Sequence, residues 1–540
     1  MYKFIFLAWL AVVFSGCART DSPEPLNTAR AETERLAADV RFLADDALEG
    51  REAGTRGYDL AALFVAERFR ALGLEPGGDD DSFFQPVPLL EYELRSTGSL
   101  TIGDLEFVAG EDYLVSASSE DEAIDISAPL VFAGLCFASE RYDQNDFEGL
   151  DLEGKIAVCM SGAPKRLDSE EMAHFRSTQA QRVSEQGAVG FIRIQSESLE
   201  KIFPFERYRR MLELGLPRMA WLDGDGQPFS LAPNIKASGV LSLSGGERLI
   251  TSVGHSWEEI LAATESEAGE VPRVDLGLTA RIRAESDHRR LTSNNVVGIL
   301  PGGDPVLADE YLILVAHLDH LGVKATPEEN DDEIYNGAMD NAGGISALLE
   351  VARLLKSSPP KRSVIFLAVT AEEMGLNGSS YYARHPTVPA DRMVAVLNLD
   401  MPILTYGFTD IVAFGAERSS LYQPVLDAAE AHGVVLSPDP FPEQGIFTRS
   451  DHYMFVKQGV PAVYLKPGFA NGGEEAQTMF LETHYHEPSD EIELVDFDAL
   501  RRFTDVKVNI ARNIADMDKR PVWNAGDFFG TTFNGPMAEE

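Results

Sequence analysis

The chain has 540 residues, 44% of them apolar, and carries a formal net charge of −41 with a pI near 4.5. This length suggests roughly three or four structural units, and the apolar share is ordinary for a globular protein. The large negative charge disfavours nucleic acid and an anionic membrane surface as partners. We therefore expect a globular protein of several units with an acidic surface.

Residues 1–16 have the pattern of a signal peptide. Lys3 precedes the apolar run FIFLAWLAVVF, which is too short to span a bilayer. The run ends in FSGC, which resembles the lipobox of bacterial lipoproteins and implies that Cys17 becomes the lipidated first residue. Ala18 follows, not the Asp that commonly retains such proteins at the inner membrane, so an outer-membrane lipoprotein facing the periplasm is favoured. Plain secretion is the alternative, and no later segment has the long uncharged run of a transmembrane helix.

The composition divides the rest of the chain into five segments. Residues 17–34 are polar and contain proline, as in a tether. Residues 35–114 begin with amphipathic helical patterns and are predicted to be an N-terminal helical part of the catalytic domain. Residues 115–270 change to short β-like runs with turns, and residues 271–520 alternate apolar runs with helical patterns. Residues 521–540 form an acidic tail with no evident role.

Two cysteines remain besides Cys17. Cys136 and Cys159 lie in the strand-like runs LVFAGLCFA and KIAVCMS. An exported compartment permits a disulfide between them, and two buried free thiols fit equally well. Neither lies beside a histidine or a second cysteine at metal spacing, so we assign them no chemistry.

From about residue 290 the pattern indicates an α/β fold with a mainly parallel central sheet and flanking helices. The runs NNVVGIL, YLILVA, SVIFLAVT, VAVLNLD, DIVAF and PAVYL are short and almost wholly apolar, as expected of strands buried on both faces. Amphipathic helical patterns such as ISALLEVARLLKSS lie between them.

Side chains that bind metals follow these apolar runs. In open α/β sheets, ligands collect outside the carboxyl ends of the strands, so side chains from separate segments are expected at one edge. We find no HExxH, GxSxG or GxGxxG motif, which disfavours a single-zinc protease of that type, a serine nucleophile and a dinucleotide site. The candidate residues are His317, Asp319, Asp340, Glu372, Glu373, Asp400 and His486.

This set resembles the M28 family of zinc peptidases, in the branch with an inserted protease-associated (PA) domain. The segments LADDALEGREAGTRG, HLDH, GAMDNAGG, AEEMGLNGS, NLDM, SDHYMFVKQGVPAVYL and HEPSD occur in the order found in the family. The PA resemblance rests on YDQNDFEGLDLEGKIAVCMSGAP and EQGAVGFIRI, within residues 115–270. The resemblance implies a zinc exopeptidase fold with an inserted β-rich PA domain.

The resemblance also implies a role for each candidate. Asp340 would bridge two Zn²⁺ ions, followed by a peptide bond that is often cis in the family. His317 and Asp400 would complete one metal site, while Glu373 and His486 would complete the other. Glu372 would be the general base, and Asp319 would stand behind His317 and fix its tautomer. His484 competes with His486, but the family's His-x-Pro-x-Asp pattern selects His486; His320 and His452 are taken as structural or substrate-lining.

The implied chemistry is hydrolysis by a metal-bridged hydroxide. Two divalent ions contribute +4 and the carboxylates of Asp340, Glu373 and Asp400 contribute −3, so one hydroxide makes the centre neutral. Glu372 would take a proton from that water and return it to the leaving amine. Histidine and carboxylate ligands without cysteine suit zinc, with cobalt or manganese as possible replacements in vitro.

The leading prediction is therefore an aminopeptidase that acts on peptides with a free N-terminus. The alternatives on the same fold are another metal-dependent hydrolase, a carboxypeptidase-type enzyme or a glutaminyl cyclase that uses one zinc. An alternative of another class is a non-catalytic binding module, which would be expected to lack one or more ligands. The sequence leaves the side-chain preference open, with residues 449–452 as a candidate contributor, and leaves the oligomeric state open.

Overall fold

The structure of the protein is a computed structural model that describes residues 30–213, 215–324 and 332–539. The predicted signal peptide, the predicted lipidation site Cys17 and most of the predicted tether lie outside the described residues. The chain from Ala31 onward forms one compact unit. No helix in this described part is long and apolar enough to cross a bilayer.

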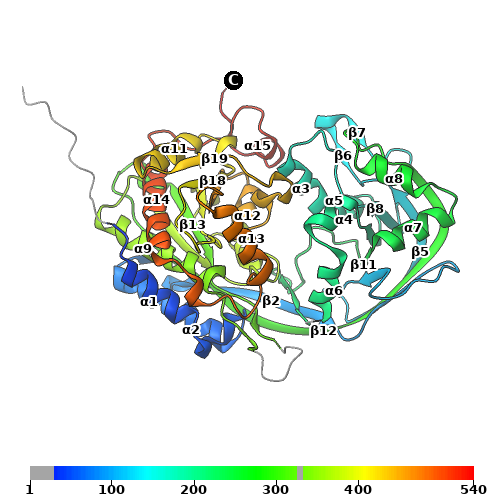
Figure 1. Ribbon diagram of the computed structural model, residues 1–540, viewed down its shortest axis with the longest axis horizontal. Helices are drawn as coiled ribbons and strands as arrows, with labels where there is room; N and C mark the ends of the chain where they lie inside the picture. Colours follow the sequence, from blue (N-terminus) through cyan, green and yellow to red (C-terminus); the bar gives the residue numbers. More distant parts are fainter. Residues whose placement is uncertain (1–29, 214, 325–331, 540) are drawn as a thin grey trace, which may run out of the picture. The chain divides into compact units, whose positions relative to one another are not determined.

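The main lobe is built on a mixed sheet whose central strands are parallel (Figure 1). The four central strands β20, β17, β13 and β16 run parallel, and antiparallel pairs join them to β18 on one side and β12 on the other. This arrangement confirms the predicted α/β fold. The strands, in spatial order, are β19 (Val435–Ser437), β18 (Asp410–Phe414), β20 (Ala462–Pro467), β17 (Met393–Asn398), β13 (Tyr311–His317), β16 (Ser363–Val369) and β12 (Arg273–Leu300).

Both faces of this sheet are buried. Alternate residues of β13 enter two different cores: Leu312 and Leu314 belong to one cluster, and Ile313 and Val315 to another. The first core lies under helices that contact one another and lie side by side in Figure 1: α1 (Thr33–Leu43), α2 (Arg56–Leu72), α9 (Gly343–Ser357), α11 (Tyr422–Ala431) and α14 (Phe497–Ala515). The helices α10 (Asn377–Arg384) and α12 (His452–Val456) contact each other and the strands of the sheet. Burial on both faces explains why the strand YLILVA is apolar at almost every position.

A second lobe, residues 99–285, contains its own sheet. The strands β5 (Ala123–Ala133), β8 (Ile156–Met160), β9 (Gly190–Ile194) and β11 (Ala237–Leu241) are parallel, with β4 (Tyr113–Val115) antiparallel at the edge. Cys136 and Cys159 form a disulfide there, with a Cα–Cα distance of 5.7 Å. The lobe also contains α3 (Ser169–Ser177), α4 (Gln179–Glu185), α5 (Glu197–Ile202), α6 (Phe205–Glu213), α7 (Leu243–Ser252) and α8 (Trp257–Thr264), so it holds more helix than the sequence pattern indicated.

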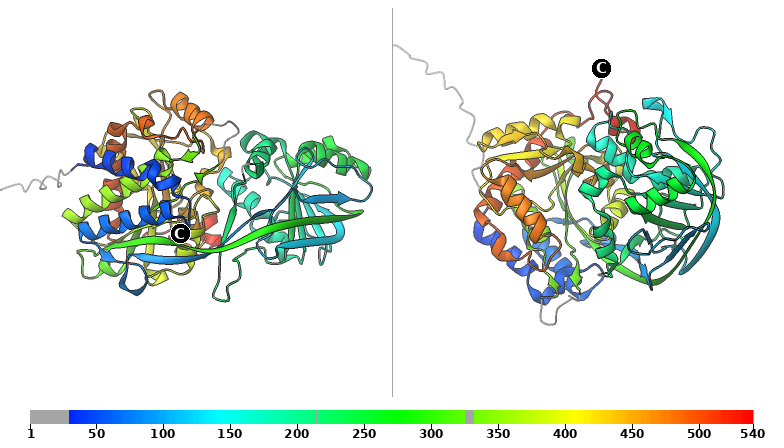
Figure 2. Two further views of the ribbon diagram at one scale, coloured as in Figure 1. Left: turned by 90° about the horizontal axis from the view of Figure 1, so that it is seen from below. Right: turned by 45° about the vertical axis from the view of Figure 1, so that its right-hand side comes forward.

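One long strand connects the two lobes. The 28-residue β12 pairs with β5 through its first half and with β16 through its last residues (Figure 2). Between these two pairings it is antiparallel to β2 (Phe84–Leu94), which also pairs with β10 (Arg218–Trp221), and β3 (Ser99–Ile102) pairs with its first half. The sheet of the second lobe therefore extends beyond the predicted range 115–270 at both ends.

The prediction that residues 35–114 form a helical part is wrong for its second half. Helix ends with α2 at Leu72, and residues 84–115 contain the strands β2, β3 and β4 instead. In β2 the alternate residues Gln85, Val87 and Leu89 are buried, which is the two-residue period of a strand. Pro86 and Pro88 also disfavour a helix in this segment.

The tail that follows residue 520 has a structural role that the sequence did not indicate. Trp523 is fully buried, and its indole N–H donates to the carbonyl of Gly459 at 2.8 Å. The short helix α15 (Phe528–Thr532) contributes Phe528 and Phe529 to the core that also contains Phe175 of the second lobe. The tail is thus part of the contact between the lobes.

Replacement of Trp523 by alanine should lower the free energy of unfolding by about 3–5 kcal/mol, because it leaves a cavity and an unpaired carbonyl. Urea unfolding of the purified protein measures this change. The matched control is Thr532→Ala, an exposed residue in the same tail, which should cost less than about 0.5 kcal/mol. Equal stability of the two variants would show that the tail is not part of the folded unit.

Candidate metal centre

Four candidate residues lie at one edge of the main sheet because of where their strands end. His317 is the last residue of β13, and Asp400 lies two residues beyond the end of β17. Glu372 and Glu373 lie in the turn between β16 and α10. Since β13, β16 and β17 are parallel neighbours, their carboxyl ends bring these side chains to the same place.

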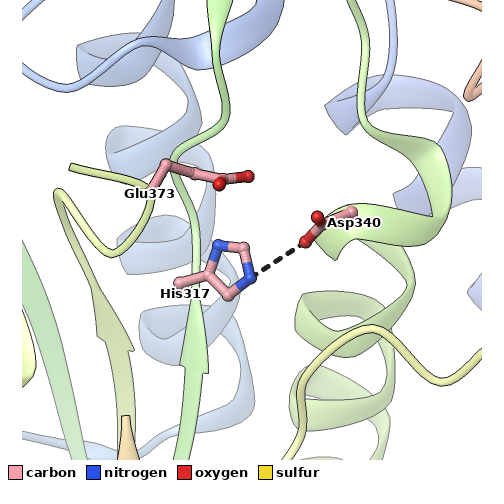
Figure 3. A group of neighbouring side chains, drawn as sticks. All are labelled: His317, Asp340 and Glu373. Atoms are coloured by element: carbon pink, nitrogen blue, oxygen red, sulfur yellow. Dashed lines mark ion pairs between the residues drawn. The ribbon is translucent and has the colours of Figure 1, made fainter. Parts of the chain in front are cut away.

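Asp340 comes from a different element, the π-helical turn η5 (Ala338–Ala342) that precedes α9. The peptide bond between Asp340 and Asn341 is cis. Asp490 holds the turn in place, because its carboxylate accepts the main-chain N–H of Met339 at 2.9 Å and that of Asp340 at 3.0 Å. The Asp340 carboxylate itself is 4% exposed and faces His317 (Figure 3).

The two oxygens of Asp340 face different histidines. Its Oδ1 is 3.1 Å from His317 Nε2, and its Oδ2 is 3.4 Å from His486 Nε2. His317 Nε2 also lies 3.1 Å from Asp400 Oδ1, while His486 Nε2 lies 3.0 Å from Glu373 Oε2. The five predicted metal ligands therefore form two sets that share Asp340. One ligand atom from each of His317, Asp340 and Glu373 also lies within 4.8 Å of the others.

The contact of Asp319 with His317 differs from the one expected. His317 Nδ1 lies 3.2 Å from the main-chain carbonyl of Asp319, so the carbonyl, not the carboxylate, orients the imidazole. The Asp319 carboxylate instead accepts the main-chain N–H groups of Glu372 at 3.1 Å and Glu373 at 3.3 Å. The chain turns directly after His317, the last residue of β13. This turn places the Asp319 carbonyl next to the His317 ring and the Asp319 carboxylate next to the turn that carries Glu372 and Glu373.

The remaining histidines take distinct positions. His484 is directed away from the cluster, with its Nδ1 2.8 Å from Ser489 Oγ. His320 Nδ1 lies 2.6 Å from Glu373 Oε1, so it orients that carboxylate from the side opposite His486. His452 is fully buried between the rings of Phe447 and Tyr464.

Sequence reasoning assigned no role to Arg51, although it lies in the motif LEGREAG. Its guanidinium is 1% exposed and donates to the carbonyls of Leu318 at 3.0 Å, Asn336 at 2.6 Å and Gly337 at 3.1 Å. Arg51 therefore fastens the residue that follows His317 to the loop that precedes Asp340. Asp490 was also missed; the only signal for it was its place in the motif HEPSD.

Ser450 and Tyr464 position Asp400. Ser450 Oγ donates to Asp400 Oδ2 at 2.5 Å, and the Tyr464 hydroxyl donates to the Asp400 carbonyl at 3.1 Å. The Ser450 hydroxyl in turn accepts from the side-chain amide of Asn398 at 2.6 Å. Asp400 Oδ1 is left facing His317.

The site concentrates negative charge in a buried volume. Burial raises the pKa of Asp319, Asp451 and Asp490 to about 7 each, and it raises the pKa of Glu372 well above the usual range. Burial opposes protonation of His317, but Glu372 and the other neighbouring carboxylates hold the pKa of His317 well above its usual value. The carboxylates of Glu373 and Asp340 act in the same way on the pKa of His486. Such a cluster favours the binding of cations.

The cluster opens into a cavity of about 410 Å³. Val412, Phe414 and Tyr464 form part of its wall in the main lobe, and Ile202 and Arg207 of the second lobe also line it. The Arg207 guanidinium lies over the ring of Tyr485, at 5.5 Å, beside His486. The second lobe thus forms one wall of the site.

Comparison with known proteins agrees with this geometry. Residues 295–511 match the family described as peptidase family M28. Over 489 residues it is 25% identical to Aminopeptidase YwaD of Bacillus subtilis (strain 168), covering 88% of this chain and 84% of that protein. It is 30% identical over 229 residues to Probable leucine aminopeptidase 2 of Aspergillus fumigatus, covering 39% of this chain and 42% of that protein.

Among solved structures, the chain is similar to an aminopeptidase from Aneurinibacillus sp. strain AM-1. The TM-score is 0.53 at 20% sequence identity, and the match covers 90% of this chain and 94% of that chain. At this identity the likeness establishes the fold. The family match of residues 295–511 and the similar aminopeptidases support an aminopeptidase-like hydrolase.

The protein stripped of metal should lose stability as the pH rises from about 5 to 8. A carboxyl with a pKa near 7 in the folded chain and about 3.9 in the unfolded chain favours the folded state when protonated, so stability falls as pH rises through this interval. The raised pKa values of His317 and His486 act in the same direction above about pH 6.5. Urea unfolding after chelation measures the effect.

The zinc-loaded protein provides the control for this experiment. Because bound cations compensate the ionised ligands, zinc should raise stability more at about pH 8 than at about pH 5.5. Higher stability of the chelated protein at the upper pH would contradict this electrostatic account.

Proposed function

We propose that the protein is a co-catalytic di-zinc exopeptidase, most simply an aminopeptidase that removes residues from the free N-terminus of peptides. The observation that carries the proposal is the placement of Asp340, whose two oxygens face His317 and His486 separately. One carboxylate oriented in this way suits two cations better than one. The aminopeptidases similar to this chain support the same activity.

The donor set fits zinc. His317 and Asp400 with one oxygen of Asp340 would hold one ion, while His486 and Glu373 with the other oxygen would hold the second. Imidazole and carboxylate ligands without thiolate are typical of catalytic zinc. His320 and Asp319 would fix the orientation of these ligands by hydrogen bonds, as outer partners do at other zinc sites.

Bound zinc would supply a polarised scissile carbonyl and a water of lowered pKa. Glu372 lines the same cavity without belonging to either ligand set, so it can accept a proton from the attacking water and deliver it to the leaving amine. The main-chain N–H of Glu372 is held by Asp319, which fixes the turn that carries the base. A buried carboxyl with a raised pKa suits this double role as base and then acid.

The form of the cavity supports cleavage at the chain end. Its volume of about 410 Å³ accommodates only a short stretch of peptide, and Ile202 and Arg207 bound it from the second lobe. An extended polypeptide would need an open groove on both sides of the metal centre. We propose that the second lobe, as a PA domain, restricts access in this way.

The glutaminyl cyclase alternative requires one zinc and leaves the second ligand set without a purpose. Glu373 contacts both His486 and His320, so the residues proposed for the second zinc ion are all in place, which favours two zinc ions over one. A non-catalytic binding module is disfavoured for the same reason. We also propose export as an outer-membrane lipoprotein through Cys17, which the Cys136–Cys159 disulfide supports because disulfides persist in oxidising compartments.

Substitution Glu372→Gln should lower kcat by about 10²–10⁴-fold with little loss of metal, because it removes the base and keeps the ligands. The assay uses aminoacyl chromogenic substrates in free and N-acetylated forms, with zinc-loaded and chelated enzyme. We expect hydrolysis of the free-amine forms alone, abolished by chelation. Cleavage of acetylated forms would reject the aminopeptidase assignment, and full activity of the variant would reject Glu372 as base.

Metal content tests the two ligand sets directly. The wild-type protein should bind two zinc ions per chain, and His486→Ala should bind at least one fewer at matched free zinc, measured by elemental analysis after dialysis. His484→Ala is the matched control, two residues away and outside the cluster, and should bind as many ions as wild type. A single ion in the wild-type protein would contradict the di-zinc proposal.

A further inference from the structure

One wall of the cavity carries a cation that the proposed chemistry does not use. Lys466 lines the cavity from β20, two residues after Tyr464. Alternate residues of a strand point to the same side, so Lys466 faces the cavity next to the tyrosine that contacts Asp400. In the neighbouring strand β18, Val412 pairs with Lys466 and Phe414 pairs with Tyr464, and both also line the cavity.

A second cation, Arg449, lies at the rim of the same cavity. It directly precedes Ser450, whose hydroxyl donates to Asp400, and its guanidinium donates to the neutral side chain of Gln444 at 3.2 Å. Among the described residues no carboxylate lies within ion-pair distance of Arg449 or Lys466. The charges on this wall are therefore available to a ligand.

Lys466 is electrostatically uncompensated once the metal centre is filled. Burial lowers its pKa, and Asp400 and Asp340 are the carboxylates that oppose this effect. When cations neutralise those two carboxylates, the ammonium group of Lys466 loses the two acids that favour its charge. Glu372 and Glu373 of the metal centre also line the cavity, as do Asp439 and Glu443 outside it, and none of these four acids forms an ion pair with Lys466. Asp439 instead accepts the main-chain N–H of Phe441 at 2.9 Å. A buried unpaired ammonium is costly unless a ligand compensates it.

We propose that Lys466, with Arg449 at the rim, binds a carboxylate of the substrate, so that the enzyme prefers peptides that bring a negative charge into this cavity. This inference rests on the proposed exopeptidase function. The carboxylate has two possible sources: the side chain of an N-terminal Asp or Glu, or the C-terminus of a dipeptide. The apolar wall formed by Val412 and Phe414 accommodates the carbon chain between that carboxylate and the metal centre.

Pairs of substrates that differ only in this charge test the proposal and separate its sources. Glutamyl and glutaminyl p-nitroanilides share size and lack a C-terminal carboxylate. Leucylglycine and leucylglycinamide share a neutral N-terminal residue and differ at the C-terminus. We expect kcat/KM to favour the charged member of at least one pair by about tenfold or more, and the pair that responds identifies the source. Equal kcat/KM values within both pairs would overturn the inference.

Substitution Lys466→Met removes the charge and keeps the length of the side chain. It should reduce the preference within the responding pair to less than about threefold while changing kcat/KM for the neutral member little. Lys201→Met is the matched control: this exposed lysine lies on α5 next to Ile202 but does not line the cavity, and its loss should leave the preference intact. Equal losses for both members in Lys466→Met would indicate a merely structural lysine.

Binding without turnover separates failure of this inference from failure of the proposed function. Calorimetric titration of zinc-loaded Glu372→Gln with the same substrate pairs should show tighter binding of the charged member, and Lys466→Met should remove the difference. Metal-dependent hydrolysis without any charge preference would overturn the carboxylate site alone. Absence of hydrolysis together with a charge preference in binding would overturn the exopeptidase and retain the site.

Discussion

The structure depends on one electrostatic constraint: several carboxylates are buried together at the end of a parallel sheet. Asp319, Asp340 and Asp400 are each less than a tenth exposed, and Glu373 lies between them and two histidines. Carboxylates at this density are stable only when protons, cations or directed hydrogen bonds compensate their charge. Arg51 and Lys507 supply part of the charge, and Lys507 donates to the carbonyl of Asn398 beneath Asp400. Protons compensate part of the remaining charge, as the raised pKa values of Asp319, Asp451 and Asp490 indicate, and the proposed zinc ions would compensate it in their place.

The surrounding main chain is organised to orient these side chains before any cation arrives. Asp490 accepts two N–H groups from the turn that carries Asp340, and Asp319 accepts two from the turn that carries Glu372 and Glu373. Each turn is thus held by hydrogen bonds to an acidic side chain that is not one of the candidate metal ligands. Since ligand geometry decides metal affinity and, in the proposed reaction, the position of the attacked carbonyl, these hydrogen bonds would link the folding of two loops to that reaction.

The strands of the main sheet could be predicted from the sequence because they depend on local patterns, while metal binding by the candidate ligands stays a prediction. Buried parallel strands require continuous apolar runs, and His317, Glu373 and Asp400 follow such runs directly. The roles of Arg51 and Trp523 could not be predicted, because each depends on contacts with residues far away in the chain. The contact between the Asp319 carbonyl and His317 could not be predicted either, because the identity of a side chain does not show which main-chain atom a turn directs toward its neighbour. The strand at residues 84–94 was missed because its partner, β12, is assembled from a segment about 200 residues later.

In the proposed reaction the second lobe matters only if it stays over the candidate metal centre, and one partly buried arginine explains how it does so. Arg418 of the main lobe pairs with Asp168 at 2.8 Å and with Glu170 of the second lobe, and with Asp527 of the tail at 3.3 Å. These carboxylates raise its pKa although burial acts against the charge. Two separate segments, the start of α3 and the tail, therefore converge on one guanidinium of the main lobe, beside the aromatic core that contains Trp523 and Phe529. With that junction and the shared strand β12 in place, Ile202 and Arg207 remain a fixed wall of the cavity. In the proposed exopeptidase, the contact between the lobes would then limit the size of the accepted peptide as much as the candidate metal ligands would.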